Sequence, residues 1–347
     1  MTLVMVLGLL ALKIGYRDRG IGTDYLGYYK YYEQARNGNL VADDSEPGYQ
    51  ALIFLGSLLR IPPELFFATV AFLQMWLTLW AIRVIMTSAF GKGSRADTLT
   101  LISAAFLLIW PFYWNSILNV LRQGLAIPLV LVGYTRLQER RFAKGLVALA
   151  AASSFHWSSV AFAAVSLISI GFHRLTIWLT MGSVAIYMIQ ISGNILQQIE
   201  TSIGVPLYSM VMDYGAGATY RSGYRYDFLA FSMIPLILSM MTGIGHFGRP
   251  YKQRLQQLYS TLLLPFLWFG FGNYSDRLLL PAWIAMPVVL VGLTLSKVKL
   301  GLGARLVLCA AALFVGVALL TLAMFPENIF VIQGIVRVAA KTASQWP

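Results

Sequence analysis

Apolar stretches long enough to cross a membrane recur along the whole chain, and short polar segments separate them. Stretches such as Leu101–Pro111 and Val307–Phe325 are apolar on every side, which favours helices over the alternating strands of a barrel. The pattern predicts an all-α, polytopic integral membrane bundle in a single transmembrane domain, residues 1–347. The expected spans are Met1–Tyr16, Glu64–Met86, Thr98–Trp110, Ile117–Thr135, Leu175–Ile191, Asp227–His246, Leu258–Gly270, Leu278–Leu295 and Arg305–Phe325.

Two further apolar stretches, Pro47–Ile61 and Gly145–Ile170, do not fit a simple crossing. Pro62 and Pro63 follow the first, and the polar run Ser153–Ser159 interrupts the second. We expect both to be re-entrant hairpins or half-helices on the outer side, giving about 10–12 membrane helices. Because irregular backbone at membrane depth is tolerated where it lines a cavity, they also predict a cavity open to the outside.

Composition agrees with this membrane class and changes how the charge is interpreted. Hydrophobic residues make up 58% of the chain and charged residues only 12%, against about 25% charged in soluble proteins. The net charge of +12 would suggest nucleic acid in a soluble protein, but here basic residues gather in short loops that set orientation. No nucleic-acid partner is therefore expected. The residues predicted to face the cytoplasm are Lys92, Arg95, Arg140, Arg141, Lys144, Lys252 and Arg254.

A second set of polar residues falls on the outer face in this topology, in the loops 17–46 and 192–226 and at the ends of spans. Arginines outside are not explained by orientation, and charges at a membrane edge indicate function. Arginine holds phosphate bidentately, and aromatic rings offer flat faces for sugars. Together they predict a site for a lipid-linked saccharide diphosphate.

Individual residues of this set also have structural interpretations. Arg122 could form a salt bridge, His156 could cap a hairpin through its neighbouring serines, and Asp24 could start a helix. The tyrosines at 28–32 could form an interfacial aromatic belt, and Asp276 could pair with Arg277.

Four strings occur in order along the first half of the chain. They are Arg17…Gly22-Thr23-Asp24-Tyr25…Tyr28, then Glu46-Pro47-Gly48-Tyr49, then Asn119…Leu121-Arg122-Gln123…Ala126, then Ser154-Phe155-His156-Trp157-Ser158. In these strings the chain resembles the exopolysaccharide polymerase family called EpsG, a branch of the Wzy-type polymerases. The similarity covers residues 17–165, with a weaker echo at Tyr274–Leu278. The family usually has a longer first span, and the segment 192–226 has no counterpart, so Arg221 and Arg225 rest on topology alone.

The resemblance implies a bacterial inner-membrane glycosyltransferase that polymerises undecaprenyl-diphosphate-linked oligosaccharide repeat units at the periplasmic face. It also implies an architecture similar to the metal-independent glycosyltransferases of the GT-C class. The expected partners are the lipid-linked substrate, membrane lipids and a chain-length regulator protein. No cofactor is expected, and no metal site, since the chain has three histidines and no Asp-x-Asp pair.

The mechanism that follows is direct attack of an acceptor hydroxyl on the anomeric carbon, which inverts it. The diphosphate is already a good leaving group, so the protein must neutralise its charge and remove one proton. The candidate catalytic residues are His156, Asp24, Glu46 and Arg122, with His156 the first choice of base. The candidate diphosphate- and sugar-binding residues are Arg17, Arg19, Arg277, Tyr25, Tyr28, Gln123, Asp276, Tyr49, Arg221 and Arg225.

Two other functions remain open. An O-antigen-type ligase would transfer the finished glycan to a different acceptor. A flippase or transporter of lipid-linked saccharides would show repeat-related halves and charges at the bilayer midplane, whereas this chain has its charges at one face.

Overall fold

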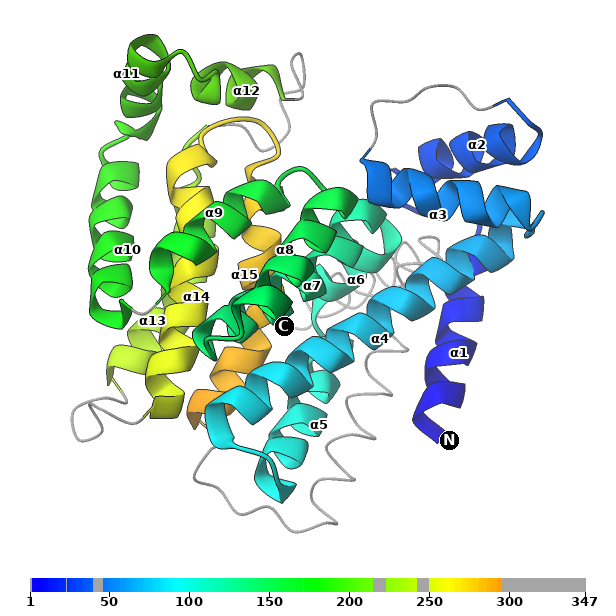
Figure 1. Ribbon diagram of the computed structural model, residues 1–347, viewed down its shortest axis with the longest axis horizontal. Coiled ribbons are helices and arrows are strands. Elements are labelled where there is room, and N and C mark those ends of the chain that lie inside the picture. Colours follow the sequence, from blue (N-terminus) through cyan, green and yellow to red (C-terminus); the bar gives the residue numbers. More distant parts are fainter. Residues whose placement is uncertain are drawn as a thin grey trace, which may run out of the picture.

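The computed structural model describes residues 2–22, 24–39, 46–170, 172–214, 223–241 and 250–294. Within those ranges every regular element is a helix (Figure 1). The helices are α1 (Thr2–Gly15), α2 (Tyr25–Arg36), α3 (Pro47–Leu58), α4 (Pro63–Phe90), α5 (Ser94–Leu108), α6 (Pro111–Leu118), α7 (Leu121–Gln138), α8 (Phe142–Phe155), α9 (Ser159–Ser169), α10 (His173–Met188), α11 (Ser192–Ile203), α12 (Leu207–Asp213), α13 (Tyr226–Met241), α14 (Pro250–Phe269) and α15 (Ser275–Thr294).

The centre of the bundle is built from α4, α7, α14 and α15. Helix α7 packs against α4 and α8, α1 lies along α4, and α14 packs against α10 and α15. Buried leucine, isoleucine, valine and alanine side chains from these helices form the main core. Figure 1 shows α2 and α3 at one end of this bundle, with α11 and α12 at the same end across from them.

Two of the described helices, α4 and α15, are long and apolar enough to cross a membrane alone. Two bent pairs pass the same test when each is taken as one span: α5 with α6, bent by 72°, and α10 with α11, bent by 102°. The all-helical, polytopic membrane class is confirmed. The number of membrane helices and the GT-C-like arrangement stay predictions.

Several predicted boundaries are wrong. The predicted span Ile117–Thr135 crosses a break between α6 and α7, at Asn119 and Val120. The outer segments 17–46 and 192–226 were expected to be loops, yet they contain α2, α11 and α12. These helices are too polar or too short to stand out as spans, so hydropathy alone reads them as loops. The predicted span Arg305–Phe325 lies outside the described residues.

The interruption expected inside Gly145–Ile170 is confirmed. Helix α8 ends at Phe155 and α9 begins at Ser159, with His156 in an extended conformation between them. Pro47–Ile61 forms one short helix, α3, with Pro47 in its first turn. Whether either stretch re-enters the membrane, and whether a cavity lies between them, stays a prediction.

The tyrosines of α2 form a second core with α3, α4 and α7. Tyr25, Tyr29 and Tyr32 are buried against Phe66 and Phe67 of α4. Tyr32 stacks on Phe66 with ring centroids 4.0 Å apart. This packing explains why an aromatic-rich, weakly apolar segment forms a helix, because its tyrosines recur every three or four residues. The aromatic core fixes α2 and α3 above the start of α7.

Candidate active site

Glu46 is the centre of a buried polar cluster at the end of the bundle where α2 and α3 lie. Its side chain is only 3% exposed, and its two oxygens have different partners. Oε1 lies 2.7 Å from Nδ1 of His156 and accepts the backbone N–H of Trp157 at 3.2 Å. Oε2 accepts a hydrogen bond from Nη1 of Arg122 at 2.6 Å. The carboxylate therefore joins an imidazole to a guanidinium.

Three helix ends bring these groups together. Glu46 precedes the first turn of α3, Arg122 lies in the first turn of α7, and His156 follows the last turn of α8. The close approach depends on Gly48, where a Cβ would lie 2.6 Å from Oγ and 2.8 Å from the carbonyl oxygen of Ser154. Only glycine lets the start of α3 lie directly on the end of α8.

The ionisation state of Glu46 determines which ring nitrogen of His156 carries the hydrogen. Burial alone would raise the pKa of the carboxyl, but hydrogen bonds from the His156 ring and from the backbone of Glu46 itself, together with the charge of Arg122, lower it to about 2. An ionised carboxylate only accepts hydrogen bonds, so Nδ1 of His156 carries the hydrogen. In the neutral imidazole Nε2 then holds the lone pair and can accept a proton.

A second ion pair lies at the start of α15. Nη2 of Arg277 lies 3.2 Å from Asp24, and its Nη1 donates to the Tyr214 hydroxyl at 2.8 Å. Both charged side chains stay partly exposed, Arg277 at 26% and Asp24 at 32%. Arg277 therefore pairs with Asp24, a residue from the other end of the described sequence.

Tyr28 of α2 connects the two ion pairs. Its ring centroid lies 5.8 Å from the guanidinium carbon of Arg122. Burial raises the pKa of the Tyr28 hydroxyl, and the charges of Arg122, Asp24 and Arg277 all act on it. Gln123, which follows Arg122 on α7, donates to the backbone carbonyl of Arg277. The two pairs therefore belong to one polar site.

Helix N-termini surround this site. Helices α2, α3, α7 and α15 all begin beside it: Asp24 and Glu46 directly precede α2 and α3, and Arg122 and Arg277 lie in the first turns of α7 and α15. No N-cap side chain bonds to the first turn of α2, α3 or α7. The partial positive charge of these ends adds to that of the arginines and favours an anion.

Arg17 and Tyr25 lie beside the site and not in it. The Arg17 side chain donates to the carbonyls of Ile14, Ile21 and Leu118, at 3.0, 3.2 and 2.9 Å. Burial lowers the pKa of Arg17 to about 10, partly offset by Tyr25, whose ring lies 3.6 Å from the guanidinium carbon. Arg17 therefore connects the end of α1 to the end of α6, just before the break that precedes α7.

The other predicted ligands are spread more widely. Arg19 is exposed and donates to the Tyr29 hydroxyl at 2.6 Å. Tyr49 is 1% exposed, and its buried hydroxyl has no hydrogen-bond partner among the described residues. Arg225 forms a bidentate pair with Asp227 at the start of α13, and Asp276 is buried at the start of α15. Arg221 lies outside the described residues.

Sequence reasoning missed two contributors, Tyr214 and the backbone N–H of Trp157. Tyr214 ends a segment that the sequence pattern left as loop, and a backbone donor has no side-chain signal. Tyr274, whose ring lies 4.6 Å from the guanidinium carbon of Arg277, has a positive φ of 53°. Such a conformation is strained for a tyrosine and is typical of functional sites.

No group of three His, Cys, Asp or Glu side chains that could hold a metal ion occurs in the part of the chain that the structure describes. In the site itself the carboxylates of Glu46 and Asp24 are each paired with an arginine. The donor set therefore suits an anionic ligand better than a cation.

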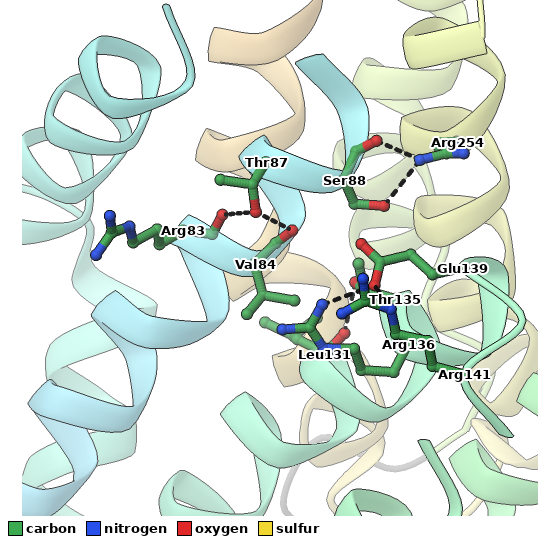
Figure 2. Close-up of polar contacts among 10 residues, drawn as sticks. All are labelled: Arg83, Val84, Thr87, Ser88, Leu131, Thr135, Arg136, Glu139, Arg141 and Arg254. Atoms are coloured by element: carbon green, nitrogen blue, oxygen red, sulfur yellow. Dashed lines mark hydrogen bonds and ion pairs between the residues drawn. The ribbon is translucent and has the colours of Figure 1, made fainter. Parts of the chain in front are cut away.

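Arg141 and Arg254, two of the basic residues predicted to share one side, lie at the other end of the bundle (Figure 2). Arg254 of α14 donates to the hydroxyl and carbonyl of Ser88 on α4, and Glu139 pairs with Arg136 and Arg141 at the end of α7. Helix α7, which has 18 residues and is about 27 Å long, separates Arg122 near its start from Glu139 just after its end. Which compartment each end faces stays a prediction.

Fold and site together define a membrane-embedded helical protein with one polar, arginine-containing site at one end. The chain belongs to the EpsG family, whose model matches residues 1–332. The match extends the similarity well beyond the strings at 17–165 and includes Arg277. No curated protein and no solved structure matches the chain. Membership indicates a Wzy-like polysaccharide polymerase with glycosyltransferase-like activity.

Proposed function

We propose that this protein polymerises oligosaccharide repeat units carried on a lipid diphosphate, undecaprenyl diphosphate in a bacterial inner membrane, at the periplasmic face. The observation that carries the proposal is Glu46, which joins His156 to Arg122 within reach of the Asp24–Arg277 pair. His156, which can accept a proton, therefore lies near Arg122 and Arg277, which attract an anion.

In this mechanism His156 is the general base. The hydroxyl of the incoming repeat gives its proton to Nε2 while its oxygen attacks the anomeric carbon of the growing chain. The bond from that carbon to the diphosphate oxygen breaks, and the lipid diphosphate leaves with the electron pair. Glu46 keeps the imidazole in the required tautomer and balances the imidazolium that forms.

The arginines stabilise the negative charge that develops on the leaving diphosphate. Arg122 uses Nη1 for Glu46 and its side chain is 31% exposed, so donors remain for a phosphate oxygen. Arg277 is aimed by Asp24 and Tyr214. Preorganised donors of this kind stabilise charge as it develops, so no metal is needed. Direct displacement inverts the anomeric configuration.

The test is polymerisation of purified lipid-linked repeat units by the protein in lipid nanodiscs, with a chelator present. We expect a ladder of products from the wild type and from Arg141→Ala, a control at the far end of α7. His156→Ala and Arg122→Ala should lose at least about 10²-fold in rate. A product that retains the donor configuration would overturn the mechanism.

The same assay separates the other functions. Transfer of glycan only to a different acceptor would make the protein a ligase. Movement of saccharide across vesicles without any coupling would make it a transporter, and would remove the catalytic roles of His156 and Glu46.

A further inference from the structure

Gln74 is a buried amide near the middle of α4, a helix that is long and apolar enough to cross a membrane. The residue is 1% exposed, and its Nε2 donates to Oγ of Ser116 on α6 at 2.8 Å. Oγ of Ser116 in turn donates to the carbonyl of Tyr113 at 2.6 Å. The other amide atom, Oε1, is buried and has no hydrogen-bond partner among the described residues. Gln74 therefore joins α4 to α6 and leaves one acceptor unpaired.

The start of α7 lies directly on this amide. A Cβ at Gly124, the fourth residue of α7, would lie 2.6 Å from Oε1 of Gln74 and 2.5 Å from the carbonyl oxygen of Ser116. A larger residue would clash with α4 and with the backbone of α6, so the close approach requires glycine. Gln74 therefore contacts the chain on both sides of the break that separates α6 from α7.

The same turn of α7 carries two residues of the polar site. Arg122 lies two residues before Gly124, and Gln123 between them donates to the backbone carbonyl of Arg277. Because the chain breaks between α6 and α7, the direction in which α7 begins depends on its contacts with other helices. Gln74 provides such a contact from α4. A shift of this turn would move Arg122, and charged groups that act on a substrate must be held closely in place.

Stability alone does not explain an amide at this position. A buried polar atom without a hydrogen bond destabilises a fold, and its exchange for an apolar side chain of similar shape is nearly neutral or stabilising. Leucine at position 74 would leave no unpaired atom, since the Ser116 hydroxyl would keep its bond to Tyr113. Residues that are unfavourable for stability are typical of functional sites, where the arrangement of other groups depends on them.

We infer that Gln74 is a positioning residue for Arg122. It holds the start of α7 against α4 and α6, so that the guanidinium of Arg122 is already in place when the diphosphate binds. Gln74 does not contact the substrate and acts through Ser116 and Gly124. The inference rests on the proposed function and deepens it, because it assigns a residue outside the polar site that determines where one of the arginines lies.

The first test measures polymerisation by Gln74→Leu in the wild-type background and in the Arg122→Ala background. A residue that acts through Arg122 has no further effect once that arginine is gone, so we expect a loss of at least about tenfold in the first background and less than about twofold in the second. The unfolding midpoint of Gln74→Leu should equal or exceed that of the wild type. Equal losses in the two backgrounds, or a lower unfolding midpoint, would overturn the inference.

Gln257→Leu is the matched control, because it makes the same change at another buried amide. Gln257 lies on α14 and donates to the carbonyl of Ser169 at the end of α9. Its polymerisation rate should stay within twofold of wild type, and a loss as large as that of Gln74→Leu would overturn the inference. Ser116→Ala, a second variant, removes the acceptor of the Gln74 bond with little change in volume. Its loss should also vanish in the Arg122→Ala background, and a loss that persists there would contradict the positioning role.

The second test does not depend on catalysis. Farnesyl diphosphate, a short polyprenyl diphosphate without sugar, is titrated into the protein in nanodiscs, and the Kd is measured by calorimetry. Gln74→Leu and Arg122→Ala should each raise the Kd at least about threefold, and the double variant should raise it no further than Arg122→Ala alone. Equal Kd values for wild type and Gln74→Leu, or no binding by the wild type, would overturn the inference. A wild type that binds the diphosphate in this Gln74-dependent way but never couples repeat units would remove the proposed polymerase function and leave the positioning role.

Discussion

At the scale of single residues, Glu46 can be changed so that shape is kept and charge is lost. Glu46→Gln retains an oxygen that can accept from His156 but no longer balances Arg122 or an imidazolium. We expect polymerisation to fall by about 10²–10⁴-fold, as for a general base that loses its orienting carboxylate. Thermal unfolding should show a loss of about 1–3 kcal/mol from the charged hydrogen bond.

The matched control for this change is Glu139→Gln. Glu139 also pairs with arginines, Arg136 and Arg141, but at the opposite end of α7. It should keep its polymerisation rate within twofold. Equal losses of polymerisation rate in both variants would mean that Glu46 affects the rate only by stabilising the fold.

The pH dependence follows from the same carboxyl. Its pKa in the folded protein, about 2, lies below the usual value of 4.5, so its stabilising effect is complete above about pH 4.5 and is lost as the pH falls through 2. Between pH 5 and 8 Glu46 stays ionised, so the factor by which Glu46→Gln slows polymerisation should be constant across that range. Polymerisation rates of both proteins, measured from pH 5 to 8, check this expectation. A factor that shrinks towards pH 5 would contradict an ionised Glu46.

At the scale of elements, the contact of α3 with α8 depends on one glycine. Gly48→Ala places a methyl group against the backbone and side chain of Ser154, so α3 must shift and take Glu46 with it. Since overpacking of this kind typically costs about 1–3 kcal/mol, we expect a lower unfolding midpoint and at least tenfold slower polymerisation.

Gly27→Ala on α2 is the control for this helix contact. A Cβ at Gly27 meets nothing within 4 Å, so the change should stabilise the helix by up to about 1 kcal/mol and leave the rate unchanged. Unchanged activity in Gly48→Ala would show that the position of Glu46 does not depend on this contact.

Some of the helices could be predicted from the sequence pattern and others could not. Strong apolar runs predicted the central helices, and Pro47 and the serines around His156 predicted where short helices begin and end. Helices α2 and α11 could not be read from hydropathy, because half of each is polar and their stability comes from tertiary packing.

For the site, sequence order named Glu46, Arg122, His156, Asp24 and Arg277, and the fold brings all five to one end. The partners could not be predicted. Asp24, a candidate catalytic residue or helix start from the sequence, pairs with Arg277, far away in the chain. Arg17 instead donates hydrogen bonds to three backbone carbonyls, and one of them, that of Leu118, lies at the break between α6 and α7. Long-range pairings of this kind follow from topology, which local patterns do not encode.

At the scale of the whole molecule, the two ends of the bundle differ in how their charges are used. At one end, Arg122 and Arg277 are paired with Glu46 and Asp24 around a partly exposed site. At the other end, Lys92 is exposed in the turn between α4 and α5, and Lys144 is exposed in the first turn of α8. Basic residues at such positions are the pattern that retains loops in the cytoplasm. The polymerase proposal requires the first end to face the periplasm, where lipid-linked repeats would be joined.

Single-cysteine labelling tests this orientation. In a Cys309→Ser background, Lys30→Cys on the exposed face of α2 should react with a membrane-impermeant maleimide in cells whose outer membrane has been made permeable. Lys92→Cys and Lys144→Cys should react only after the inner membrane is opened, and detergent should make all three equal. Labelling of Lys92→Cys from outside would place His156 and the arginines in the cytoplasm. Polymerisation at the periplasmic face would then be impossible for this site, whatever the effect of its variants.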